Sequence, residues 1–152
     1  MSDAELHRRA ERFVVRALKR ARLRAEALGG HLLVAVPSGR STMVRVLMRQ
    51  GPHRRGGGLN LGLHWMLGAT EAEHVALVDL TRRRGWLLPL GEFCSRARPV
   101  AGGRFHLDWI VARLGTTRTK IADEAEFAPY AFDESLPQLA RRLAVDRGRR
   151  RA

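Results

Sequence analysis

The first thirty residues carry a regular amphipathic pattern, and this pattern limits the folds open to the chain more than any other feature. Apolar residues recur every three or four positions, as on one face of a helix: Leu6, Ala10, Phe13, Val14, Ala17, Leu18, Ala21 and Leu28. The opposite face is basic: Arg8, Arg9, Arg12, Arg16, Lys19, Arg20 and Arg24. Ser2 and Glu5 form a capping-box pattern, and Gly29-Gly30 supplies a stop. The sequence predicts one helix between these signals. Such a helix can lie on a membrane surface, but we favour packing of its apolar face on a sheet.

Short β-rich runs separated by Gly, Pro and Ser follow this helix. His31–Val36 and Thr42–Met48 flank Pro37-Ser38-Gly39 and predict a hairpin, in which Arg45 lies on the face opposite Val44 and Val46. Three further runs predict strands: Leu59–Leu67, His74–Leu80 and Trp86–Leu90, the last near a sheet edge because of Pro89.

The rest of the chain completes an α/β (α+β) fold. Phe105–Leu114 fits a helix or a strand, Asp133 or Ser135 caps a final helix, and the basic residues 147–152 read as a flexible tail after one domain over 1–146. We therefore expect a long N-terminal helix packed on a mixed, hairpin-containing central sheet, with a C-terminal helix. Trp65, Trp86 and Trp109 lie in apolar patterns, which predicts that they pack in the core rather than stack on bases.

The net charge of the chain limits the classes of partner that it can bind. Lys and Arg total 28 against 15 Asp and Glu, so the net charge is +13, and all but two of the basic residues are arginines. A field of this sign favours polyanions: nucleic acid first, then an anionic membrane surface or an acidic protein. Cys94 is the only cysteine, which excludes an internal disulfide and a cysteine-based metal cage. No apolar run approaches the length of a membrane span, and we expect a cytoplasmic, nucleoid-associated protein.

The distribution of acids and arginines points to phosphate binding. No Asp or Glu occurs from Ala27 to Thr70, whereas Mg²⁺ requires hard oxygen ligands. We therefore predict no metal and no cofactor. The arginines of the hairpin, the loops, the turn at 81–85 and the tail form the predicted nucleic-acid-binding set: Arg40, Arg45, Arg49, Arg54, Arg55, Arg82, Arg83, Arg84, Arg149 and Arg150.

The element order over residues 5–93 resembles the PD-(D/E)XK nuclease superfamily, particularly its Holliday-junction-resolvase-like and homing-endonuclease-like members. His74 to Leu80 and Gly85 to Phe93 look like a later strand pair of that family. The resemblance implies a restriction-endonuclease-like fold and metal-dependent cleavage of DNA. It places the family's helical Glu at Glu11, its metal-binding Asp near His31 and its (Glu/Gln)-x-Lys at Arg45-Val46-Leu47. Of these positions only Glu11 fits, which indicates a degenerate site.

Three functional hypotheses follow. We favour a protein that binds DNA, in preference to RNA, along its backbone without cutting it, within a homodimer or a larger nucleoprotein complex. The second is a Mg²⁺-dependent nuclease or junction resolvase that uses Glu11 and Asp79, with Glu71 or Glu73, although Asp79 also fits a turn-capping role. The third is an adaptor that docks on an acidic partner.

Two further features leave alternatives open. The six histidines have no tight metal-ligand spacing and read as structural or surface residues. Residues 123–134 hold five acids, which pair either with the chain's own arginines or with another basic subunit.

Overall fold

The computed structural model describes residues 2–37, 39–54, 59–115 and 120–151, with side chains described as far as residue 144. In chain order the elements are α1 (Asp3–Arg20), β1 (Arg24–Leu28), β2 (His31–Ala35), β3 (Ser41–Arg49), β4 (His53–Arg54), β5 (Leu61–Leu67), β6 (His74–Asp79), β7 (Arg84–Pro89), α2 (Leu90–Arg96), β8 (Arg98–Val100), β9 (Arg104–Ala112), β10 (Ala122–Asp123), the 3₁₀ helix η1 (Glu124–Tyr130) and α3 (Phe132–Arg151). None of the described helices is both long enough and apolar enough to cross a membrane.

The N-terminal helix is shorter than the sequence predicts. The Ser2 hydroxyl accepts a hydrogen bond from the Glu5 amide at 3.2 Å, so α1 begins as expected, but it ends at Arg20. The segment Arg24–Leu28 is a strand, β1, antiparallel to β2. Gly29 and Gly30 have φ of 50° and 84° and form the two-residue turn between these strands, where positive φ is required. The prediction of one helix as far as the two glycines is therefore wrong, because pairing with β2 outweighs a local helical pattern.

The central sheet has the order β1-β2-β3-β6-β7. The predicted hairpin is confirmed: β2 and β3 are antiparallel, and His31 pairs with Arg45. Strand β6 lies parallel to β3 and antiparallel to β7, which forms the sheet edge predicted from Pro89. Because side chains alternate across a strand, buried Val44 and Val46 face one side of this sheet and Arg45 faces the other.

A second sheet packs against the first. It has the order β10-β9-β5-β4, with β8 paired to β9. The run predicted over Leu59–Leu67 is β5, and the ambiguous run over Phe105–Leu114 is β9, a strand paired antiparallel to β5. Local periodicity allows either a helix or a strand here, and pairing with β5 makes this run a strand.

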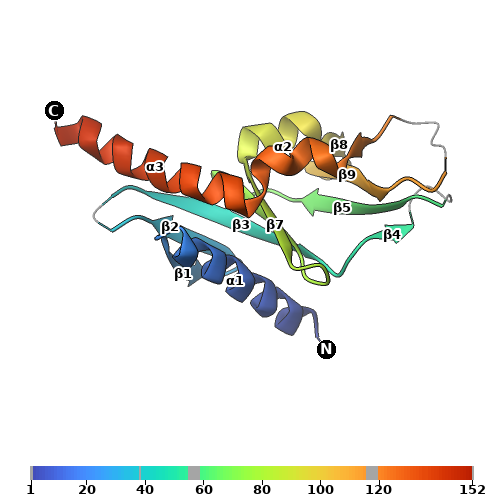
Figure 1. Cartoon of the computed structure of the whole chain (residues 1–152), viewed down its shortest axis with the longest axis horizontal. Coiled ribbons are helices and arrows are strands. Elements are labelled where there is room, and N and C mark those ends of the chain that lie inside the picture. The colour runs from blue at the N-terminus through green and yellow to red at the C-terminus, as the bar shows by residue number, and fades with distance from the viewer. Residues whose placement is uncertain (1, 38, 55–58, 116–119, 152) are drawn as a thin grey trace.

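Two hydrophobic clusters lie on the two faces of the central sheet. On one face α1 and α3 pack against it, with Val14, Leu18, Leu139 and Leu143 buried (Figure 1). The second sheet, α2 and η1 enclose the other cluster. The prediction for the tryptophans is confirmed, since Trp65, Trp86 and Trp109 lie in this second cluster and are at most 3% exposed. The expected mixed α+β architecture is thus confirmed.

The final helix begins earlier and extends further than predicted. It starts at Phe132, before the expected caps Asp133 and Ser135, and its backbone is helical through Arg151. The division into a domain over 1–146 and a flexible tail over 147–152 stays a prediction. At its start, the Phe132 ring covers Gly85 of β7 so closely that a Cβ at Gly85 would lie 2.1 Å from Phe132 Cε2.

Candidate nucleic-acid interface

The β6–β7 turn is held by a buried carboxylate. Asp79 is fully buried, and its Oδ1 accepts hydrogen bonds from the amides of Thr81 at 3.1 Å and Arg82 at 3.2 Å. Its Oδ2 accepts a hydrogen bond from Arg82 Nε at 2.5 Å. Asp79 therefore caps the turn, the plainer of its two predicted roles.

Arg82 is bound to carboxylates of its own chain. Besides Asp79, it donates from Nη1 and Nη2 to both oxygens of Glu124, at 3.0 and 2.5 Å. The hydrogen bond to Glu124 contributes most to raising the Arg82 pKa above its ordinary value. Arg84 lies 3.5 Å from Glu124 but keeps 59% of its side chain exposed. Of these two predicted phosphate ligands, Arg84 retains an accessible guanidinium and Arg82 does not.

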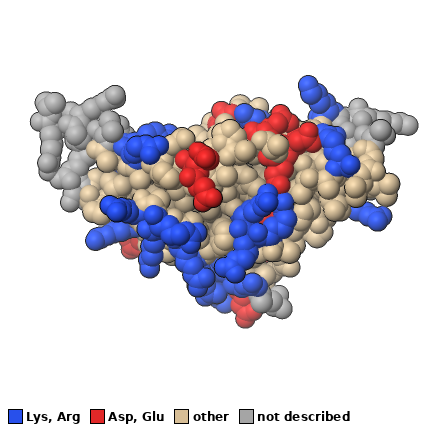
Figure 2. All heavy atoms as spheres, in the orientation of Figure 1, with Lys and Arg blue, Asp and Glu red and all other residues tan. Residues whose placement is uncertain are grey.

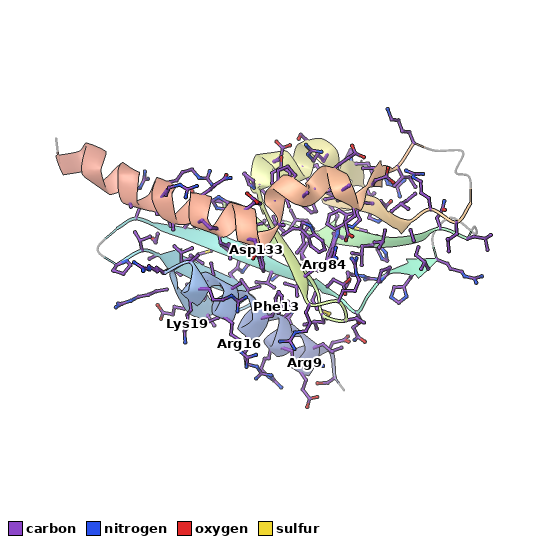
Figure 3. The ribbon with its side chains drawn as sticks, in the orientation of Figure 1. Arg9, Phe13, Arg16, Lys19, Arg84 and Asp133 are labelled. Carbon is purple, nitrogen blue, oxygen red and sulfur yellow. The ribbon has the colours of Figure 1, made fainter. Side chains whose placement is uncertain are left out.

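The third arginine of the turn, Arg83, lies beside α1. Helix α1 and the turn line a hollow of about 250 Å³. Its lining consists of four arginines, Arg9, Arg12, Arg16 and Arg83, and of the apolar side chains of Phe13 and Leu80. We call this hollow the arginine groove. Figure 2 shows the basic side chains gathered over this part of the surface, and Figure 3 shows Arg9 and Arg16 on the outer side of α1.

Most guanidinium groups of the groove have no competing partner. Among the described residues, Arg12, Arg16 and Arg83 form no hydrogen bond or ion pair. A second hollow, of about 380 Å³, continues the basic surface along α1, where Arg8 and Lys19 join Arg12 and Arg16. The helix thus presents cations at successive turns along one side.

The hairpin arginines are placed differently from the groove. Arg45 donates from Nη1 to the Gly30 carbonyl at 3.0 Å and so closes the β1–β2 turn. Arg40 and Arg49 also have interaction partners. Arg54 is exposed on the short strand β4. Arg55 lies outside the described residues, and the side chains of Arg149 and Arg150 lie outside the described part of α3.

The positions that the family resemblance assigns to metal binding hold no carboxylate on the hairpin. His31 and Arg45 are register partners, and the His31 Nε2 lies 2.9 Å from the Thr70 hydroxyl. Alternation puts both on the sheet face away from α1, whereas Leu32 and Val44 face the helix in the first cluster. Helix α1, which carries Glu11, therefore packs on the opposite face of the sheet from His31 and Arg45.

The acids of the nuclease hypothesis are dispersed. Glu11 lies 3.8 Å from His7 and lines the second hollow beside Ala27. Asp79 is bound within the β6–β7 turn, and Glu71 and Glu73 are exposed in the loop before β6. Among the described residues, no three His, Cys, Asp or Glu side chains gather as a metal site would require.

Two acids of the segment at residues 123–134 pair with arginines of the same chain. Asp123 accepts a hydrogen bond from Arg113 Nε at 2.7 Å, and Glu124 binds Arg82. For these two acids pairing within the chain holds, and for the other three acids of the segment both alternatives stay open.

Sequence reasoning missed the contribution of α1. It treats the basic face of the helix as solvated, although Arg9, Arg12 and Arg16 repeat at steps of three and four and therefore form one stripe. What the sequence does not show is that the β6–β7 turn brings Arg83 to the same stripe.

Comparisons with known proteins bear on the fold. No protein-family model and no curated protein sequence matches the chain. The solved structure of a bacterial homing endonuclease, I-Ssp6803I, is similar, with a TM-score of 0.58 and 14% sequence identity over 97% of both chains. The chain has a nuclease-like fold. At this identity the likeness shows the architecture alone, and function depends on the residues described above.

Proposed function

We propose that this protein binds DNA along its phosphate backbone and does not cut it. The observation that carries the proposal is the arginine groove, where Arg12, Arg16 and Arg83 surround one hollow without intramolecular partners among the described residues. A guanidinium binds a phosphate with two parallel hydrogen bonds, which a lysine ammonium does not.

The electrostatics support a polyanion as the ligand. The net charge is +13, and the acids nearest the turn, Asp79 and Glu124, are already bound by Arg82. Arg82 and Arg84 together balance these two carboxylates, so the charges of Arg83 and of the α1 arginines are not cancelled by them. Binding to a polyanion releases condensed counterions, so its affinity falls steeply as salt rises.

The proposed site is smaller than the predicted set of arginines. It consists of the groove residues Arg9, Arg12, Arg16 and Arg83, extended by Arg84 of the turn. Arg45 and Arg82 do not line the groove and bind groups of their own chain, so as phosphate ligands they too stay predictions. Arg40, Arg49, Arg54, Arg55, Arg149 and Arg150 stay predictions.

We further propose that the chain is a catalytically degenerate PD-(D/E)XK protein. The likeness to a homing endonuclease fold supports the architecture. Against cleavage, the hairpin offers Arg45 and apolar residues where the family needs an acid, and Asp79 is bound within its turn. Water activation by a metal ion requires an oxygen-rich site, whereas the other residues that line the hollow of Glu11 are basic or apolar.

The same reasoning extends to the setting of the protein. A backbone-binding protein without a described metal site fits a component of a nucleoprotein complex, as a homodimer or with other subunits, in the cytoplasm at the nucleoid. A preference for DNA over RNA follows only from the fold likeness.

The test combines binding and cleavage. Fluorescence anisotropy of a labelled duplex across a salt series is expected to show tight binding at low salt that weakens steeply as salt rises. The same duplex and a four-way junction, incubated with Mg²⁺ or Mn²⁺, are expected to stay intact. Cleavage abolished by Glu11→Ala or Asp79→Ala would overturn the proposal in favour of a nuclease, and binding that ignores salt would favour an adaptor.

A further inference from the structure

A larger cleft adjoins the arginine groove. Its volume is about 810 Å³, and it shares Phe13 and Arg83 with the groove. Its far wall comes from the start of α3 and from η1. In Figure 3, Phe13 lies between Arg9 and Arg16 of α1 on one side and Arg84 and Asp133 on the other.

The charged groups around this cleft are not equivalent. Three carboxylates line it, but Glu124 is bound by Arg82 and Arg84, and Asp123 is bound by Arg113. The third, exposed Asp133, forms no hydrogen bond or ion pair among the described residues.

The wall of the cleft next to α1 carries cations that, like Asp133, have no partner among the described residues. Arg20 and Arg83 both line the cleft and have no partner within the described part of the chain. The cleft therefore offers two available cations on the groove side and one available acceptor opposite them.

An aromatic surface separates these groups. Phe13 is partly exposed, and its ring centroid lies 6.1 Å from that of Phe132. Phe132 is 8% exposed and is held in place by its contact with Gly85. Phe13 is thus the ring that an incoming planar group can reach, with Phe132 behind it.

This arrangement suits a nucleobase better than another phosphate. A phosphate that moved from the groove into the cleft would meet the Asp133 carboxylate and be repelled. A base is uncharged, and each of the four bases has a π-face that stacks on an aromatic ring. A carboxylate accepts hydrogen bonds from the exocyclic amino group of cytosine, whereas thymine presents a carbonyl oxygen there.

We propose that the cleft takes one unpaired base of the DNA strand whose phosphates lie in the arginine groove, and that Asp133 favours cytosine or adenine over thymine. This inference rests on the proposed function, because the groove must hold the strand. Phe13 stacks on the base, and Asp133 reads its amino group. The protein would then favour DNA with a displaced base over fully paired DNA.

The test compares three labelled duplexes of one sequence: fully paired, with a single bulged cytidine, and with a single bulged thymidine. Wild-type protein is expected to bind the cytidine bulge about 10-fold more tightly than the paired duplex and about 5-fold more tightly than the thymidine bulge. Equal affinity for all three duplexes, with salt-dependent binding retained, would overturn this inference and leave the proposed function standing. Absence of salt-dependent binding to every duplex would overturn both.

Two variants and one matched control separate the roles of the residues. Phe13→Leu keeps an apolar side chain at the cleft, so we expect it to lose the preference for a bulge and to keep its affinity for the paired duplex. Asp133→Asn is expected to bind both bulges equally and the paired duplex slightly more tightly, because a repulsive charge is gone. Glu134→Gln removes the same charge from the same turn of α3, outside the cleft, and is expected to keep the preference for cytidine. A preference for cytidine that survives Asp133→Asn would contradict the assignment.

Discussion

Two arginines of the groove give the sharpest quantitative prediction. Arg12 and Arg16 are exposed on α1 and form no ion pair with the described residues. Their replacement in Arg12→Gln/Arg16→Gln therefore removes phosphate contacts without breaking an internal interaction. We expect the helix to remain folded, since both substitutions lie on its solvent side and glutamine is a good helix former.

The size of the effect follows from counterion release. Each phosphate contact contributes about 0.9 to the slope of log K against log salt for duplex DNA, so loss of two contacts lowers the slope by about 1.8. Between about 50 and 200 mM salt, a fourfold change, the wild type is then expected to lose about 12-fold more affinity than the double variant. Anisotropy titrations at four or five salt concentrations measure both slopes.

A matched control lies on another helix. Arg141 and Arg142 are exposed on α3 and line a hollow with His74 and Pro89, at the end of the β6–β7 pair opposite the turn. Arg141→Gln/Arg142→Gln removes the same net charge and is expected to leave the slope nearly unchanged. Equal slope changes in the two double variants would refute the reasoning, because binding would then depend on total charge and not on the groove.

Three further predictions concern the framework around the site. Gly85→Ala places a Cβ 2.1 Å from Phe132 Cε2 and is expected to destabilise the fold by about 1–3 kcal/mol, measured by urea unfolding; an unchanged midpoint would contradict the packing. Asp79→Ala leaves the amides of the turn and Arg82 without their buried acceptor. The free energy of unfolding is therefore expected to fall by about 3 kcal/mol in the same assay. A fall smaller than that caused by substituting an exposed residue would argue against the capping role. Burial lowers the pKa of His74 below 6.5, so the unfolded chain binds the proton more tightly. The unfolding free energy is therefore expected to fall as pH drops below 6.5, and His74→Gln is expected to remove part of that fall.

The sequence predicts the elements whose signals are local. The N-cap at Ser2 and the β2–β3 hairpin are confirmed because side-chain type and turn residues specify them directly. The helical pattern over Arg24–Leu28 is misleading because β1 gains its backbone pairs from β2, and a pairing between segments leaves little trace in local periodicity. For the same reason, local periodicity does not decide between helix and strand for β9, which gains its backbone pairs from β5.

The sequence predicts the chemistry of the site but not which arginines form it. Charge and the absence of acids from Ala27 to Thr70 indicate phosphate binding, but the choice among arginines depends on tertiary partners. Arg82 and Arg83 are neighbours in one turn, yet Arg82 is bound by Glu124, which lies far away in the chain, while Arg83 lines the groove. No sequence pattern separates these two residues.

Arginine modification with phenylglyoxal, read by mass spectrometry, tests the central claim most directly. Wild-type protein is modified with and without saturating duplex DNA at low salt. We expect DNA to protect Arg12, Arg16 and Arg83, while the rates at Arg141 and Arg142 stay the same. Unchanged rates in the groove, with protection at Arg141 and Arg142, would contradict the account and place the nucleic acid on α3.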